Sequence, residues 1–161
     1  MYNLKIDICL KAIFLISLIS IISAFFIEYV LGHKPCNLCL IERIPYVLSI
    51  ILVILNYISK KNEYLKIFLL LLIFCFSLII SFYHFGIEQG FFEESAVCGL
   101  KDASSILSKE EILKQLQIKT ISCKDVTFRI FGFSLTVFNM IISLFLVIFL
   151  SKIYKNYEKF K

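Results

Sequence analysis

Several features of nucleotide-binding and cofactor-binding proteins are missing from this sequence. Its 161 residues include no tryptophan, two prolines and five glycines, with no glycine-rich phosphate loop, internal repeat or low-complexity segment. It also has no haem, flavin or iron–sulfur motif. Charged residues are scarce, at 18% of the chain, and none lies in the middle of a long apolar run. A transporter is therefore disfavoured, because ionisable residues at mid-membrane depth mark the pathways of transported substrates.

Apolar residues, in contrast, make up 60% of the chain, against about 45–50% in soluble domains. They gather in four blocks of the length that crosses a bilayer core of about 30 Å as a helix. The blocks lie at about 12–31, 40–59, 67–87 and 131–150. The first lacks a small-residue cleavage site, so we interpret it as a retained helix and not as a signal peptide. The sequence predicts an all-α membrane protein with a single domain, residues 1–161, built as a four-transmembrane-helix bundle.

The distribution of charge predicts how these helices are oriented. The two termini and the loop between the second and third blocks carry a net charge of +6, while the other two loops and their flanks carry −1. Positive charge marks the cytoplasmic side, so both termini should be cytoplasmic, and the loops at about 32–39 and 88–130 periplasmic. The expected location is a bacterial inner membrane, with the lipid bilayer as a partner. The net charge of +5 then follows from topology and does not indicate nucleic-acid binding.

The second periplasmic loop is expected to carry a short amphipathic helix. The segment 108–111 has the pattern of a capping box, and Ile112, Leu113 and Leu116 follow it as an apolar stripe. Such a helix would lie on the membrane surface.

Four of the six cysteines fall in the two outward loops, where an oxidising periplasm preserves disulfides. Cys36 and Cys39 (the CxxC pair) can close a reactive disulfide or bind a soft metal. A disulfide between Cys98 and Cys123 (the loop pair) would close a loop and stabilise the fold by about 3.5 kcal/mol. A zinc site made from both pairs is disfavoured, because the loop pair is not CxxC and the oxidising side favours disulfides. We therefore expect no metal.

The remaining cysteines, Cys9 and Cys75, each lie alone in or beside an apolar block. A buried free cysteine behaves as a small hydrophobic residue. We expect both to be thiols without a role in the chemistry.

Two exchangeable cysteine pairs on one face of a membrane can form a relay through mixed disulfides. A disulfide of the CxxC pair closes almost no loop, so it adds little stability to the fold. We therefore expect this disulfide to serve a redox reaction. The last two electrons need an acceptor, and the missing cofactor motifs leave a lipid-soluble quinone as the candidate. Arg43 is placed to hydrogen-bond a quinone carbonyl and to support a thiolate, while His84 lies at the same outer depth.

These patterns resemble the DsbB family, the quinone-linked oxidases of the bacterial inner membrane that regenerate the periplasmic thiol oxidase DsbA. The resemblance covers nearly the whole chain. It is carried by residues 34–43 (KPCNLCLIER), residues 83–88 (YHFGIE), the spaced Cys98 and Cys123, and the segment 123–132 before the last apolar block. It implies that the CxxC pair lies next to the quinone and that the loop pair reacts with DsbA, with Cys98 forming the mixed disulfide.

The resemblance also assigns the other site residues and the partners. Arg43 matches the arginine of the quinone site, and His84 matches a residue beside the quinone. The implied cofactor is ubiquinone or menaquinone, and the implied partner is a DsbA-type oxidase with a thioredoxin fold. The predicted function is that of a thiol:quinone oxidoreductase, passing electrons from the loop pair to the CxxC pair and on to the quinone pool. Because this chain has no tryptophan, phenylalanine and tyrosine would have to pack around the quinone.

Three alternatives were weighed against this interpretation. A protein similar to vitamin K epoxide reductase would carry its quinone-facing CxxC motif at a late helix, whereas here the motif opens the second apolar block. A DsbB paralogue that serves a dedicated partner stays open. So does a non-enzymatic membrane subunit whose disulfides only staple the fold, which redox-inert cysteines and no bound quinone would favour.

Overall fold

The computed structural model describes residues 2–59, 62–93, 98, 122–124, 128–130 and 132–159. The amphipathic helix predicted in the second loop falls outside these residues.

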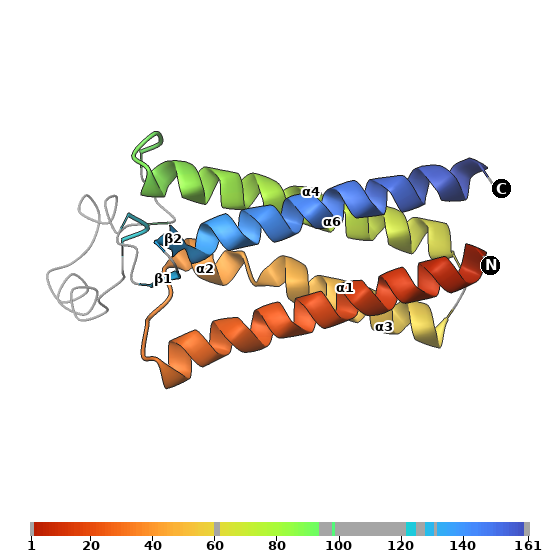
Figure 1. Ribbon diagram of the computed structural model, residues 1–161, viewed down its shortest axis with the longest axis horizontal. Coiled ribbons are helices and arrows are strands. Elements are labelled where there is room, and N and C mark those ends of the chain that lie inside the picture. The colour runs from red at the N-terminus through yellow and green to blue at the C-terminus, as the bar shows by residue number, and fades with distance from the viewer. Residues whose placement is uncertain are drawn as a thin grey trace, which may run out of the picture.

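Among the residues that the structure describes, four helices are long and apolar enough to cross a membrane, which confirms the predicted four-helix membrane bundle. The first is α1 (Tyr2–Phe25), continued by a π-helical turn, η1 (Phe26–Val30). The second combines α2 (Asn37–Ile41) and α3 (Ile44–Ile58), and the others are α4 (Glu63–Glu88) and α6 (Leu135–Lys159). Figure 1 shows both termini at one end of the bundle, with α2 at the other.

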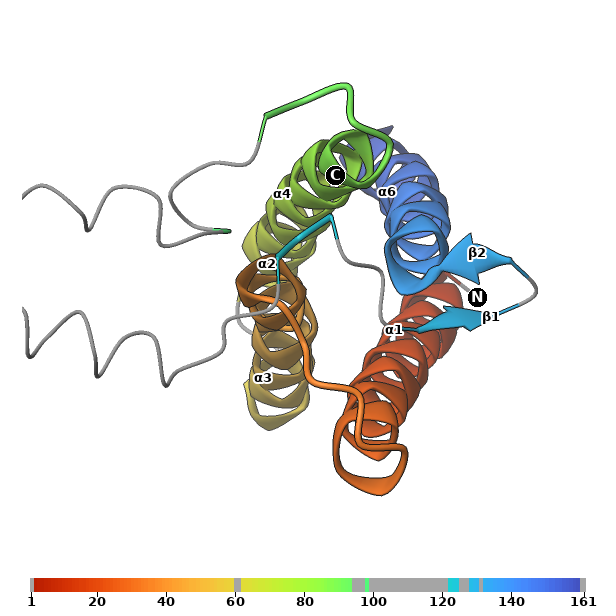
Figure 2. The ribbon, with the colours of Figure 1, turned by 90° about the vertical axis from the view of Figure 1, so that its left-hand side faces the viewer.

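The helices pack through small polar residues inside an apolar core. Helix α4 packs along α6 and α3, and α1 packs along α3; Figure 2 views the bundle from the end that carries α2. Ser17 on α1 and Ser49 on α3 are buried and hydrogen-bonded at 2.7 Å. Ser77 and Ser143 join α4 to α6 in the same way, at 2.9 Å. Small residues let the backbones approach closely, and their hydroxyls satisfy one another where no water is available.

The main core lies in the half of the bundle near the termini. It is centred on Phe74, whose side chain has no exposed surface, with Val53 and Leu146 from neighbouring helices. Cys9 is a buried free thiol in this core, and Cys75 is a half-buried free thiol. Many large apolar side chains face outward instead, as expected for a bundle whose solvent is lipid.

The second span is interrupted at Glu42 and Arg43. Pro45 has no N–H group, so it cannot donate to the carbonyl of Ile41 and the α-helical bonding pattern breaks there. The chain turns instead through a bond from the Arg43 N–H to the Leu40 carbonyl, at 3.2 Å. The two charged side chains at the break, Glu42 and Arg43, contact different neighbours, His84 and Glu28.

A small hairpin precedes the last span. Strand β1 (Arg129–Ile130) pairs antiparallel with β2 (Phe133–Ser134), and Gly132 in the turn has a φ of +86°, which favours glycine. Strand β2 runs directly into α6. The last helix therefore begins at Leu135, four residues later than the sequence indicated, because the preceding residues are used by the hairpin.

Candidate functional site

The CxxC pair lies at the N-terminus of α2, at the end of the bundle opposite the chain termini. Cys36 is the N-cap residue, and its extended backbone lets its sulfur accept a hydrogen bond from the Cys39 N–H at 3.2 Å. The two sulfurs are 2.6 Å apart, with no disulfide bond between them in this structure. Their disulfide stays a prediction. Exposed N–H groups at a helix N-terminus favour negative charge, here a thiolate.

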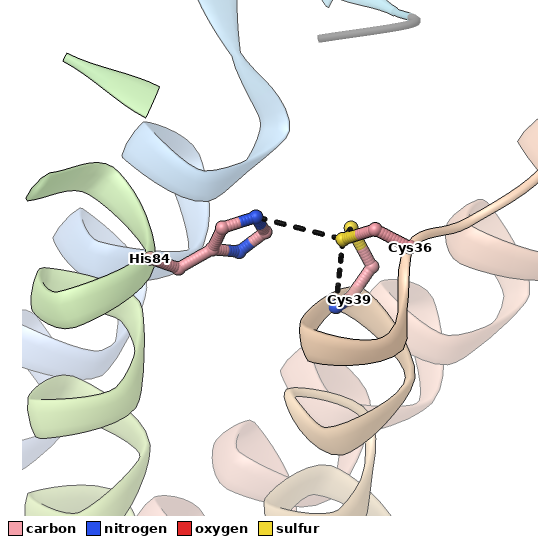
Figure 3. A group of neighbouring side chains, drawn as sticks. All are labelled: Cys36, Cys39 and His84. Atoms are coloured by element: carbon pink, nitrogen blue, oxygen red, sulfur yellow. Dashed lines mark hydrogen bonds between the residues drawn. The ribbon is translucent and has the colours of Figure 1, made fainter. Parts of the chain in front are cut away.

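His84, near the end of α4, faces the CxxC pair. Figure 3 shows its ring pointing at Cys36, with 3.5 Å between Nε2 and the sulfur. His84 is 1% exposed and Cys36 is 6% exposed. Hydrogen bonding from the Cys39 thiol, and then from His84, holds the pKa of Cys36 well below its usual range, although burial opposes this. Cys36 is therefore the sulfur that the surroundings favour as a thiolate.

This arrangement predicts an unusual pH dependence of alkylation at Cys36 in the reduced protein. A lowered pKa keeps the thiolate as the pH falls, so labelling should persist well below about pH 8.5, where an ordinary thiol is half ionised. The His84→Asn variant should shift the midpoint upward, because it removes one of the stabilising contacts. Mass spectrometry of iodoacetamide-labelled protein at a series of pH values measures both. A wild-type midpoint at that of an ordinary thiol would contradict the assignment.

Glu42 holds the histidine ring from the other side. Its Oε1 atom is 3.0 Å from His84 Nδ1, and its Oε2 atom accepts a hydrogen bond from Asn139 Nδ2, also at 3.0 Å. Asn139 on α6 also donates to Ser81 Oγ at 2.7 Å and accepts from the Tyr46 hydroxyl. Asn139 therefore faces the neighbouring helices and not the lipid. With Nδ1 donating to Glu42, the His84 Nε2 atom is left to accept a proton from Cys36.

A second buried carboxylate, Glu88, lies one turn beyond His84 on α4. Its Oε1 atom is 3.7 Å from His84 Nε2, and its side chain is 6% exposed. Thr136 donates to the same oxygen at 2.6 Å, and Ser134 donates to the other oxygen at 2.5 Å. His84 is thus flanked by a carboxylate on each ring nitrogen, and these groups come from the second, third and fourth spans.

Arg43 points towards the first span and not towards the sulfurs. It forms an ion pair with Glu28 in η1, at 2.5 Å, and its guanidinium lies over the Phe25 ring. The stabilising contacts at Cys36 come from Cys39 and His84, so a role of Arg43 in supporting the thiolate stays a prediction.

These side chains surround a cavity of about 330 Å³. Cys36, Cys39, Arg43, His84 and Cys123 all line it, so the structure brings five of the six predicted site residues to one space. Its other walls are mainly apolar, from the outer half of the first span and the start of α6, and its lining includes the aromatic residues Tyr46, Phe128 and Phe138. A concave, apolar chamber with a few converging polar groups is typical of a small-molecule site.

The loop pair lies beside this chamber. Cys98 and Cys123 form a disulfide, the pairing that the resemblance implies. Both belong to one buried cluster with Cys36, Leu38 and Ile87, and Cys123 also lines the cavity. Cys98 is 1% exposed. Reaction of this disulfide with a soluble protein therefore requires the cluster to open.

Sequence reasoning missed three acidic residues of the site, Glu28, Glu42 and Glu88. Glu28 and Glu42 gave no local signal, because their partners Arg43 and His84 lie 15 and 42 residues away in the chain. Glu88 had a visible signal: it follows His84 by four residues, the spacing that places two side chains on one face of a helix.

Comparison with known proteins gives a consistent result. The family model for disulfide bond formation protein DsbB matches residues 7–153. An uncharacterized protein, RP370, of Rickettsia prowazekii (strain Madrid E) is 31% identical over 140 residues, which cover 86% of this chain and 81% of the relative. No solved structure matches the chain. With four apolar spans and a buried CxxC pair beside a second cysteine pair, the chain is a multi-pass membrane protein that belongs to the DsbB family of disulfide bond formation proteins.

Proposed function

We propose that this protein is a thiol:quinone oxidoreductase that reoxidises a DsbA-type thiol oxidase in the periplasm. The partner's dithiol becomes a disulfide, and membrane quinone becomes quinol. The observation that carries the proposal is the single buried cluster that joins the loop disulfide to the CxxC pair at the wall of an apolar cavity. Both chain termini lie at the end of the bundle opposite the CxxC pair. If the lysine-rich termini are cytoplasmic, the end that carries the cysteines is periplasmic.

The cavity suits a quinone headgroup. Its volume falls within the range of small-molecule sites, its walls are mainly apolar, and Arg43 supplies a fixed hydrogen-bond donor at its edge. Glu28 and the Phe25 ring hold the guanidinium in place. Arg43, with His84 on the opposite wall, would hold the headgroup. When bound, a quinone supplies an acceptor for two electrons and two protons.

The chain's own residues carry the thiol chemistry. We propose that the partner's thiolate attacks Cys98, that Cys123 is released as a thiol, and that electrons then pass to the CxxC pair beside it. Burial of the loop disulfide restricts the first step to a partner that can open the cluster. Cys36 is stabilised as a thiolate in the resulting dithiol, while His84 Nε2 accepts its proton.

Glu88 is placed to move that proton onward. Its carboxylate lies 3.7 Å from His84 Nε2 at the outer end of α4, and two hydroxyls hold it there. Changing Glu88 to Gln keeps the shape of the side chain and one accepting oxygen, and its NH2 group can donate to the other hydroxyl, but the change removes a group that can carry a proton. We expect quinol formation to slow by about 100-fold, a usual contribution of a positioned acid or base. The KM for quinone should not change, which separates proton transfer from binding.

Two comparisons sharpen this test. Glu88→Asp, which still carries a proton, should recover part of the rate. Glu93→Gln, at an exposed position beyond α4, should behave as wild type. A raised KM with an unchanged kcat in Glu88→Gln would contradict a role in proton transfer and indicate a role in binding alone.

For Arg43 we expect a different signature. Arg43→Lys keeps the charge but loses the planar group that Glu28 and Phe25 hold in place. The KM for quinone should rise about tenfold, as expected for one lost charge-assisted hydrogen bond. Steady-state quinone reduction at several quinone concentrations measures it, with Arg129→Lys on the exposed hairpin as the control. An unchanged KM would reduce Arg43 to a charge that sets topology.

The function itself can be tested in cells. A bacterium that lacks its own DsbB accumulates reduced DsbA, and expression of this chain should restore the oxidised form. Alkylation of free thiols followed by gel electrophoresis reports the redox state of DsbA. Oxidised DsbA with the wild-type chain, and reduced DsbA with Cys98→Ser, would support the proposal. Reduced DsbA with a well-inserted wild-type chain would favour a dedicated partner or a purely structural role.

A further inference from the structure

We propose that the dithiol form of the CxxC pair, together with His84, binds Zn²⁺ in a three-ligand site with its fourth position open to the cavity. The metal is not a resident cofactor in this proposal. It binds only while both cysteines are reduced, so the site exists in one redox state of the protein. The donor set differs from the four-cysteine site that the sequence argued against, because it needs neither Cys98 nor Cys123.

The first support is the distance between donor atoms. The two sulfurs and His84 Nε2 all lie within 4.8 Å of one another. Tetrahedral bonds of about 2.3 Å to sulfur and 2.0 Å to nitrogen place a sulfur and a nitrogen ligand about 3.5 Å apart. Cys36 Sγ and His84 Nε2 already have that separation, 3.5 Å. The sulfurs, now 2.6 Å apart, must separate to about 3.8 Å, which a rotation of the Cys39 side chain can provide.

The second support is the way the ligands are held. A zinc-binding histidine usually donates its other ring N–H to a carboxylate, and His84 Nδ1 faces Glu42 Oε1 at 3.0 Å. Asn139 fixes that carboxylate in turn. The Cys39 N–H donates to the Cys36 sulfur, as expected for a thiolate held at a helix start. Two thiolates cancel the charge of the ion, so the buried complex is neutral, and binding releases the two thiol protons.

The third support is access. Cys36, Cys39 and His84 all line the cavity, which gives the ion a path to the site and leaves space for a water as the fourth ligand. Three protein ligands and one open position are the arrangement of exchangeable zinc sites, in contrast to closed structural ones.

Spectroscopy with Co²⁺ tests the site without any quinone turnover. Purified protein is reduced with a phosphine, freed of metal, and titrated with Co²⁺, whose tetrahedral thiolate complexes absorb in the near ultraviolet and visible. We expect one Co²⁺ per chain, displaced by Zn²⁺, and no such spectrum in the oxidised protein. Cys36→Ser, Cys39→Ser and His84→Asn should each lose the spectrum. Glu42→Gln should keep it with affinity reduced by about 10- to 100-fold.

The controls separate this site from the alternatives. The double variant Cys98→Ser/Cys123→Ser and the single variant Cys9→Ala should bind Co²⁺ as wild type does. Loss of binding in the double variant would overturn the proposal in favour of a four-cysteine site. An unchanged spectrum in His84→Asn, or binding to the oxidised chain, would also overturn it. Thermal unfolding of His84→Asn shows whether that variant is folded, and the Glu42→Gln affinity provides an independent measure if it is not.

Inhibition of quinone reduction by Zn²⁺ is a separate test, and it rests on the proposed function. Zn²⁺ added to the reduced protein before quinone should block quinone reduction, and a chelator should restore it. Zinc binding without inhibition would leave the site intact and contradict the assignment of the CxxC pair to the route of electrons.

Discussion

Changing Cys39 to Ser should abolish quinone reduction while leaving the loop pair able to accept one equivalent of electrons from a reduced DsbA-type protein. Cys39 is half-buried at the cavity wall, and its sulfur touches that of Cys36. Without Cys39 the pair cannot return to a disulfide, so each chain can react once and then stops. We expect steady-state turnover to fall by at least about 1,000-fold, because two-electron transfer through this pair has no alternative route.

Rapid mixing separates the two parts of this result. Loss of the partner's free thiols should show a single burst of two thiols, one partner dithiol, per chain, while absorbance reports no quinol. Cys75→Ser, which changes a half-buried free thiol of the third span, is the matched control and should turn over normally. Sustained quinol formation by Cys39→Ser would remove the CxxC pair from the pathway.

Changing Cys123 to Ser should trap the partner protein on Cys98. In the wild-type chain, the two residues are joined, and a mixed disulfide formed at Cys98 is released by attack from the adjacent Cys123. In the variant Cys98 is a free thiol, so its thiolate attacks the disulfide of an oxidised DsbA-type partner, releases one partner thiol and forms a mixed disulfide. Without Cys123 to attack it the adduct persists, so the covalent fraction should rise from nearly none to most of the protein. A non-reducing gel of the variant incubated with the oxidised partner measures it.

The reciprocal variant identifies the point of entry. Cys98→Ser leaves only Cys123, and we expect little adduct from it. Burial of Cys98, at 1% exposed, predicts that the adduct forms slowly unless the partner opens the cluster with Cys36 and Ile87. Adducts at Cys36 in a chain without Cys98 and Cys123, with turnover intact, would reverse the proposed order of the relay.

Much of the fold follows from local features of the sequence. Four long apolar blocks require four helices, because a bilayer offers no other partner for backbone polar groups. Lysine positions set the expected orientation, and the CxxC spacing marks a reactive pair. The short run after Arg43 also indicates that the second span must take in Glu42 and Arg43. Each of these inferences uses residues close together in the chain.

What the sequence did not reveal depends on contacts between distant segments. Glu28 pairs with Arg43 across 15 residues, and His84 meets Cys36 because α4 packs along α3 and places Ile87 in the cluster with Cys36 and Leu38. Nearness in sequence does not show which partner each charge takes, since Glu42 contacts His84 whereas Arg43 pairs with Glu28. The role of Arg43 in supporting the thiolate was inferred from such nearness and stays a prediction.

The central claim is that the two cysteine pairs form one route from a protein thiol to quinone. It is tested most directly by mixing this protein with excess reduced DsbA-type protein and quinone in the absence of oxygen, and following quinone absorbance and partner thiols together. We predict catalytic loss of quinone, with one quinol formed for each partner disulfide, and no reaction when either cysteine pair is replaced by serine. Oxidation of the partner without quinol formation, or quinone reduction that survives loss of the loop pair, would contradict the claim.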